Sequence, residues 1–407
     1  MMVVVHTVRE HEKLQPGPNL TAGDISELGD FARTVLKRSD GDLAAANYVG
    51  VVSTSRGTML EILPKIDLVA DGDDESTRRL FLSMLRSWRG MGERPMPPSH
   101  IRAIARLPML EAFVREFLKA LTLLARGGLA KRYRTVEQNQ PYLRGRLLFR
   151  HHLRENVANQ ARFFIAHAEL SKNRPANRLI QAALHRLAPR VRDARNRELL
   201  GQLRIAFADI PPSSSIHGDW RAHHVDRSMR HYGPVMQWVG LFLFHRGLAT
   251  FSGTHENVSL LFPMEQVFED FVTASFRRHQ RDYRVRAQGP GSHMATLDGK
   301  PAFQTRPDIT LAKSGKVAFV LDAKWKRMEA AQDDVRHGIA QDDVYQMHAY
   351  AGRYECRAVA LVYPTSRSFA APYRYRLFDG RTLFAAPFDV TDPEGSVRKT
   401  VQMLEAA

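Results

Sequence analysis

The alternation of apolar and polar residues divides this chain into helices and strands of ordinary length. Apolar runs at 48–52 and 58–65, joined by a turn at 53–57, predict a hairpin, and the continuous apolar run at 358–364 predicts a buried strand. Spacings of three and four predict amphipathic helices, which we place at 21–35, 76–88, 110–124, 177–187, 263–272 and 342–351.

A second hairpin is predicted at residues 306–326. Its apolar residues alternate with polar ones on both sides of a polar, glycine-containing turn at 313–316. If the turn centres on residues 314–315, antiparallel pairing places Asp308 roughly opposite Asp322. Asp322 and Lys324 then share one face, because side chains two apart on a strand point to the same side.

The order of these elements predicts three parts. Residues 1–130 read as a β-rich and helical N-terminal domain, and residues 131–252 as a basic helical region. Residues 253–407 run helix, hairpin, helix and strand, which predicts an α/β domain with a mixed central sheet.

Composition and charge narrow the class of protein. The chain has 407 residues, a net charge of +16 and a pI near 10.1, which favours a polyanionic partner, nucleic acid above all. Its single cysteine, Cys356, excludes an intrachain disulfide and suits the reducing cytoplasm, where we expect the protein. The apolar run at the start is too short for a signal peptide, and the run at 239–244 is too short for a membrane span.

Most of the charge lies in one block, residues 131–204, which holds 17 basic and 5 acidic residues. Such a block can follow a phosphate backbone in a salt-dependent way. Three other interpretations stay open: a solvated helical face, a docking surface for an acidic protein, or arginines paired with carboxylates elsewhere.

The pair Asp308 and Asp322 predicts a cation site. Two close carboxylates do not both stay ionised cheaply unless a positive charge neutralises them. Mg²⁺ takes one or two carboxylates and keeps its other positions for water or phosphate oxygens. Lys324 adds a fixed positive charge that can hold a scissile phosphate or help to position water. The alternative is an exposed hairpin with ordinary surface charges.

Two flanking helices carry further candidates. Glu269, on the helix before the hairpin, is either a further metal ligand or a solvent-facing carboxylate, and Glu265 is the weaker candidate for the same role. On the helix after the hairpin, Gln346 and Tyr350 are four residues apart and share a face.

Pro307-Asp308 followed by Asp322-Ala323-Lys324 resembles the PD-(D/E)xK nuclease superfamily. Over most of its length the chain also resembles the McrC family, the nuclease subunits of McrBC modification-dependent restriction systems. The stretches that carry this resemblance are 60–65 (LEILPK), 143–147 (LRGRL), 177–179 (NRL), 268–272 (FEDFV) and 345–350 (YQMHAY).

The resemblance implies one half of a two-component enzyme. Proteins similar to McrC dock on a hexameric AAA+ GTPase, McrB, which reads methylated cytosine in DNA, and they stimulate GTP hydrolysis through their N-terminal part. The resemblance therefore implies that residues 1–130 dock on the partner. It also implies that Asp308 and Asp322 bind Mg²⁺, with Glu269 completing the metal shell. Lys324 is then the catalytic lysine and Gln346 a supporting residue.

Two other functions stay open: a standalone nuclease of the same superfamily in DNA repair or recombination, and a non-catalytic subunit that only activates an AAA+ partner. The chain has no GxxxxGK[ST] loop, in agreement with an NTPase on a separate protein. No stretch marks the GTPase-stimulating residue, the modification specificity or the stoichiometry.

Overall fold

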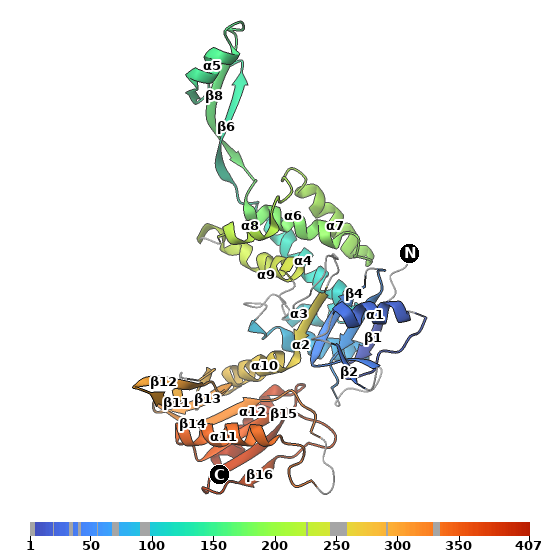
Figure 1. The fold of residues 1–407 in the computed structure, drawn as a ribbon, viewed down its shortest axis with the longest axis vertical. Helices are drawn as coiled ribbons and strands as arrows, with labels where there is room; N and C mark the ends of the chain where they lie inside the picture. The colour runs from blue at the N-terminus through green and yellow to red at the C-terminus, as the bar shows by residue number, and fades with distance from the viewer. Residues whose placement is uncertain are drawn as a thin grey trace. The chain divides into compact units, whose positions relative to one another are not determined.

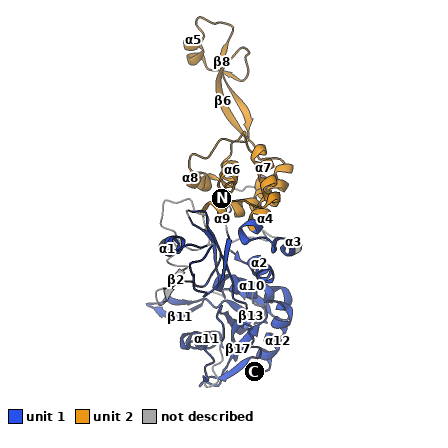
Figure 2. Cartoon of the chain, turned by 90° about the vertical axis from the view of Figure 1, so that its right-hand side faces the viewer, with its two compact units in different colours: residues 1–112, 245–407 blue, residues 113–244 orange. Residues whose placement is uncertain are grey.

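The structure is a computed structural model that describes residues 5–18, 20–31, 36–39, 42–54, 56–66, 73–89, 98–224, 227–244, 259–289, 292–328 and 334–407. The chain forms two compact units (Figure 2). Unit 1 combines residues 1–112 with 245–407, and unit 2 is the intervening segment 113–244. These units do not coincide with the predicted ranges 1–130, 131–252 and 253–407, and the boundary after 252 lies outside the described residues. The roles assigned to those ranges stay predictions.

One sheet of unit 1 contains strands from both segments of the chain that form this unit. Its strands are β1 (Val5–Arg9), β5 (Met59–Leu63), β4 (Tyr48–Ser53) and β9 (Ser259–Pro263), in that order. The predicted hairpin of β4 and β5 is confirmed. β9 pairs with the free edge of β4, which requires Gly50: a Cβ there would lie 1.9 Å from the carbonyl oxygen of Leu260. Helix α1 (Ala22–Phe31) and the hairpin of β2 (Leu36–Ser39) and β3 (Asp42–Ala45) complete this region.

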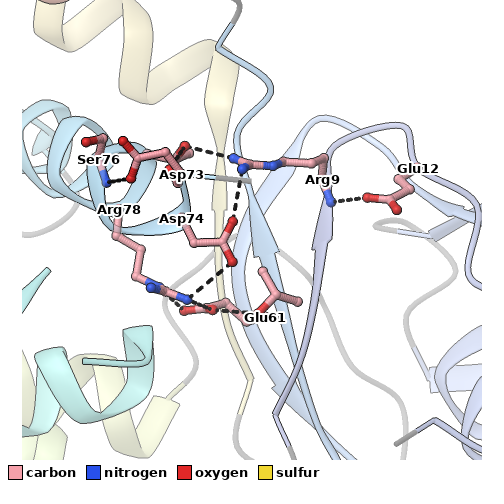
Figure 3. A network of polar contacts seen from close by, with 9 residues as sticks. Arg9, Glu12, Glu61, Asp73, Asp74, Ser76 and Arg78 are labelled. Atoms are coloured by element: carbon pink, nitrogen blue, oxygen red, sulfur yellow. Dashed lines mark hydrogen bonds and ion pairs between the residues drawn. The ribbon is translucent and has the colours of Figure 1, made fainter. Parts of the chain in front are cut away.

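Helix α2 (Asp74–Leu85) is tied to this sheet by a buried charge. The side chain of Glu61 on β5 is fully buried and accepts hydrogen bonds from Arg78 Nε and Nη2, at 2.9 and 2.7 Å, and from Met109 N at 2.7 Å. Figure 3 shows Arg78 between Glu61 and Asp74, while Asp74 also pairs with Arg9. The LEILPK stretch therefore places a carboxylate where it holds a strand, α2 and the start of α4 (Met109–Arg126) together. Helix α3 (Pro98–Ile104) packs beside α2.

The second sheet of unit 1 is mixed, as the sequence predicts, with the order β10-β13-β14-β15-β17-β16. β13 and β14 form the predicted hairpin, and β14, β15 and β17 run parallel. The bounds are β10 (Arg284–Ala287), β13 (Ile309–Lys313), β14 (Lys316–Ala323), β15 (Ala358–Pro364), β16 (Tyr373–Arg376) and β17 (Thr382–Phe388). A separate hairpin pairs β11 (Ser292–Leu297) with β12 (Lys300–Thr305).

Three helices pack on this sheet: α10 (Met264–His279), α11 (Gln341–Tyr354) and α12 (Pro393–Glu405). Met347 and Ala351 of α11 enter one apolar cluster with Val320, Val359 and Leu361 of the central strands. Because strand side chains alternate, the face that carries Val320 also carries Asp322, so α11 covers the end of the sheet where the predicted acidic residues lie.

Unit 2 contains helices and a long two-stranded ribbon, which we call the arm (Figure 1). The arm pairs β6 (Arg132–Gln140) with β8 (Phe163–Ser171), adds the short β7 (Arg146–Leu147), and carries α5 (Phe149–Glu155) at the end away from the helices. Those helices are α4 from residue 113, α6 (Pro175–Leu187), α7 (Ala194–Ala206), α8 (Ile216–Ala222), a 3₁₀ turn (Arg227–Tyr232) and α9 (Gly233–Phe244). The predicted basic helical region, residues 131–252, therefore also contains strands at 132–140, 146–147 and 163–171, which the sequence did not predict.

The base of the arm is fixed by Asn177, the first residue of the NRL stretch. Its side-chain nitrogen donates to the carbonyl oxygens of Ala130 and Lys172, and its oxygen accepts a hydrogen bond from Tyr232. Arg178 forms a two-pronged ion pair with Asp219 of α8. In the described part of the chain, no helix is both long and apolar enough to cross a membrane.

Candidate active site

The two acidic residues of the hairpin lie where the strand register predicts. Ile309 pairs with Leu321, and Asp308 and Asp322 are the next residues toward the same end of the hairpin. The Oδ2 atom of Asp308 accepts a hydrogen bond of 2.8 Å from the backbone N–H of Ala323. Asp322 is only 2% exposed. The hairpin thus holds both carboxylates side by side, with Asp322 buried and Asp308 half-buried.

Burial and mutual repulsion disfavour the charged forms of both groups. Burial, together with the charges of Asp322 and Glu269, raises the pKa of Asp308 to about 8. Burial also raises the pKa of Asp322, against the opposing effect of Lys324. A cation placed between the two carboxylates would offset this repulsion. The close pair of carboxylates is the feature from which the sequence predicts a cation site.

Lys324 follows β14 and sits among acceptors. Its Nζ lies 2.8 Å from Asp322 Oδ2 and 3.3 Å from Asp343 Oδ1, and it donates to Gln346 Oε1 at 3.3 Å. Burial alone would lower the pKa of Lys324, but the charges of Asp322 and Asp343 outweigh it and raise the pKa. Both carboxylates therefore favour the protonated, positively charged form of the amine.

Helix α11 supplies two of these acceptors. Gln346 donates from Nε2 to the hydroxyl of Tyr350 at 3.0 Å, which orients its Oε1 toward Lys324. Sequence reasoning predicted this pair but did not propose Asp343 as a site residue. The signal was present, because Asp343 and Gln346 are three residues apart and share a helix face.

Helix α10 brings two glutamates toward the same place. Glu269 pairs with Arg89 Nη2 at 2.7 Å, and its pKa is raised by burial despite the charge of Arg89. Arg89 also binds the neighbouring Asp270, through its backbone N–H at 2.8 Å and its side chain. Glu265 contacts Asn47 instead, at 3.5 Å. Sequence reasoning missed Arg89, because no local pattern links residues so far apart in the chain.

Several of these groups line one open cavity of about 390 Å³: Glu265, Glu269, Asp308, Lys324 and Asp343, together with Gln266, Ala323, Trp325, Lys326 and Ala340. Across the described ranges, no group of three or more His, Cys, Asp or Glu side chains is arranged to hold a metal ion. The donor set nevertheless fits Mg²⁺, which needs only one or two carboxylates and completes its shell with water or phosphate oxygens. Asp308 and Asp322 are the residues that fit this role. The carboxylate of Glu269 is instead ion-paired with Arg89.

Trp325, the residue after Lys324, forms a hydrogen bond with Glu10, which directly follows the first strand of the chain. Trp325 Nε1 donates to both carboxylate oxygens of Glu10, at 3.0 and 3.2 Å. Glu10 is 2% exposed, and burial raises its pKa to about 7, partly offset by this hydrogen bond. Nothing in the sequence around Glu10 predicted the contact.

Comparison with known proteins identifies the family. The chain matches the family described as "McrBC 5-methylcytosine restriction system component" over residues 43–364. It is similar in structure to McrC bound to McrB AAA+ hexamers from Thermococcus gammatolerans, with 18% identity and a TM-score of 0.75 over 98% of this chain and 100% of that one. A chain of the McrBC complex from the same organism matches with 20% identity and a TM-score of 0.53, over 69% of this chain and 89% of that one.

No curated protein matches the sequence. The family match covers most of the chain and confirms the predicted resemblance, while the structural likeness shows a shared fold. The chain therefore belongs to the McrBC 5-methylcytosine restriction system component family, on its McrC-like side.

Proposed function

We propose that this chain is the Mg²⁺-dependent DNA endonuclease subunit of a McrBC-type restriction system and works with a McrB-like AAA+ GTPase. One observation carries the nuclease assignment: Asp308, Asp322 and Lys324 converge at the end of one hairpin, beside a cavity. This is the arrangement of a PD-(D/E)xK nuclease, and the family match supports it.

Each residue has a task in phosphodiester hydrolysis. Asp308 and Asp322 would hold Mg²⁺, which when bound supplies charge neutralisation at the scissile phosphate. Lys324 keeps its proton and faces the negative charge that develops on the phosphate oxygens. Gln346 and Asp343 hold the lysine amine in place through the contacts described above.

The partner is proposed on the family match and on the likeness to McrC bound to McrB AAA+ hexamers. The surface of unit 2 offers it a docking site. The arm exposes large apolar side chains, which are rare on a free surface and typical of an interface: Tyr133, Tyr142, Leu143, Phe149, Leu153, Val157 and Leu170. Among the described residues before Leu123, none of the large apolar side chains is comparably exposed. This favours the arm over the range 1–130 as the docking surface.

Substitution of the cavity residues tests the chemistry. Asp308→Asn and Asp322→Asn remove the charges that would hold Mg²⁺ but keep the side-chain volume, and Lys324→Ala removes the fixed positive charge. We expect each to lower Mg²⁺-dependent cleavage by a factor on the order of 10² to 10³ or more. Asp298→Asn, on an exposed turn of the same unit, is the matched control and should cleave normally. A folded Asp322→Asn protein that cuts at the wild-type rate would refute the assignment.

The alternatives are separated by a four-way assay. Cleavage and GTP turnover are measured with and without the cognate AAA+ partner and with and without GTP, on methylated and unmethylated DNA. We expect little cleavage by this chain alone and double-strand cleavage when partner and GTP are present. Efficient cutting without the partner would favour a standalone nuclease. GTPase stimulation without any cutting would favour a non-catalytic activator.

A further inference from the structure

Unit 1 contains a second, larger cavity on another side of α10. It measures about 880 Å³ and is bordered by α2, α3, α10 and the segment that leads into α12. Helix α2 packs against both α3 and α10, so the walls belong to one packed region. We call this cavity the arginine groove after the six arginines that line it: Arg79, Arg86, Arg102, Arg277, Arg278 and Arg281.

The lining of the groove is strongly one-sided in charge. Besides the six arginines it contains His279 and four hydroxyl side chains, Ser83, Ser87, Ser275 and Thr391, and it contains no Asp or Glu. Two acidic residues contact this lining from outside it: the carboxylate of Glu394 lies 3.8 Å from His279 Nδ1, and Asp389 accepts hydrogen bonds from the backbone N–H and hydroxyl of Thr391. In the part of the chain that the structure describes, no ion pair is made by Arg102, Arg277, Arg278 or Arg281.

Folding alone does not explain this arrangement. A favourable interaction with the helix macrodipole accounts for basic residues in the last turn of α10, where Arg277 and Arg278 lie. It does not account for Arg79 on α2, which lines the same space. A lining with six arginines and no Asp or Glu has a positive potential, which favours the binding of a polyanion.

The chemistry of the lining selects phosphate groups. A guanidinium offers planar, two-pronged hydrogen bonding to phosphate oxygens, and serine and threonine hydroxyls are common phosphate donors in protein–DNA contacts. The volume far exceeds that of one phosphate, and the arginines come from several elements, so the groove suits a chain of phosphates.

The position of the groove along α10 relates it to the candidate active site. Glu269 lines the first cavity, and Arg277 lines the groove eight residues later on the same helix. At 1.5 Å per residue this is about 12 Å along the helix axis. DNA rises 3.4 Å per base pair, so this axial offset alone spans roughly three or four base pairs, and it is a minimum separation because the two cavities lie on different sides of the helix.

We propose that the arginine groove binds the DNA backbone a few base pairs from the scissile phosphate and holds the duplex against unit 1. The proposal rests on the proposed nuclease function for the identity of the polyanion. The contacts are to phosphates, so they set the position and orientation of DNA but carry no sequence information.

The test measures how DNA binding depends on salt. Arg102, Arg277 and Arg278 are exposed and are replaced together by glutamine, which removes three charges and preserves helix propensity. The matched control replaces Arg357, Arg398 and Lys399, which are exposed on the same unit and lie outside the lining. Anisotropy of a labelled duplex is recorded for the full chain in EDTA, so that the result is independent of cleavage.

The groove variant should lower the magnitude of the slope of log K against log salt by about 2 to 3, since each phosphate contact contributes roughly 0.9. Its affinity at low salt should fall on the order of tenfold or more. The control should keep the wild-type slope, because screening over about 10 Å at 0.1 M salt suppresses effects of distant charge.

Two outcomes overturn the proposal. The first is an equal loss in both variants, or in neither, which would make the effect one of net charge or show that the groove does not contact DNA. The second is GTP binding by the wild-type chain, without DNA, that disappears only in the groove variant, which would make the groove a nucleotide site. Thermal unfolding of both variants verifies that each remains folded.

Discussion

The buried ion pair of Arg78 and Glu61 should contribute strongly to the stability of this protein. Replacing Arg78 by leucine leaves the carboxylate of Glu61 buried without its two strongest donors. We expect the free energy of unfolding to fall by about 3 to 5 kcal/mol, the usual cost of breaking a buried pair on one side. Chemical denaturation measures it. The exposed pair of Arg106 with Glu75 provides the control, since Arg106→Ala should change stability by no more than about 0.5 kcal/mol. Equal effects in both variants would contradict a structural role of the buried pair.

Glu10 should make stability depend on pH in an unusual direction. Its pKa is about 7 in the folded protein against an ordinary value of 4.5, so the folded state binds a proton that the unfolded chain has released. Stability therefore falls as the pH rises from about 4.5 to 7, and the loss is complete above that range. Glu10→Gln keeps an acceptor for Trp325 and removes the titration.

The Glu10→Gln variant should match wild type near pH 4.5 and exceed it at pH 8, by at most about 3 kcal/mol for a shift of this size. Urea denaturation at both pH values measures the difference. A variant that is less stable than wild type at pH 8 would show that the buried carboxylate is needed in its charged form.

The site residues were predictable from the sequence where they lie on one strand or one helix with a regular pattern of side chains. Asp308, Asp322 and Lys324 follow from strand alternation, and Gln346 from helix spacing and the family resemblance. Arg89 and Glu10 were not predictable, because both reach the site from loops and strands far away in the chain. Asp343 was missed for another reason: an acidic residue in the first turn of a helix already has an explanation in the macrodipole.

Among the elements, the arm depends on one glycine of the LRGRL stretch. Gly145 has a positive φ of 73°, and a Cβ there would lie 2.4 Å from the carbonyl oxygen of Ala166 on β8. Gly145→Ala should therefore push β7 away from β8 and destabilise the arm by on the order of 1 to 3 kcal/mol. Hydrogen exchange of the amides in 163–171 measures it.

Gly201→Ala is the control for this substitution. Gly201 lies in α7 and nothing surrounds its missing Cβ, so alanine should stabilise that helix by about 0.5 to 1 kcal/mol. Unchanged exchange in 163–171 of the Gly145→Ala protein would mean that β7 contributes little to the arm.

The arm also shows which strands cannot be predicted from the pattern of apolar and polar residues. β6 and β8 were hidden in the basic block because β6 buries neither face: its residues are half-buried or exposed throughout. A strand without a buried face has no reason to alternate apolar and polar residues. Strands with buried faces were predicted at β4, β5, β13, β14 and β15, whereas β9 and β17 are also buried and were missed.

For the whole molecule, the two-part composition of unit 1 predicts that its halves need each other. β9 pairs with β4, Trp325 bonds to Glu10, and Arg89 binds Asp270, so residues 1–112 and 245–407 share one core. We expect the two pieces, produced as separate polypeptides in one cell, to copurify. The control carries Gly50→Val, which blocks the approach of β9. A piece 245–407 that is equally stable alone would instead support an autonomous C-terminal domain, as the sequence predicts.

Because β4 pairs with β9, this sheet cannot be completed until late in the synthesis of the chain on the ribosome. Strand β4 is made early, yet its partner Ser259–Pro263 follows only after all of unit 2 has been translated. At about 5 to 20 residues per second, the edge of β4 waits on the order of 10 to 40 seconds. During that interval an unpaired, apolar strand edge is open to association with other nascent chains. Yield in a cell should therefore depend on chaperone capacity and translation speed more than the stability of the finished protein suggests.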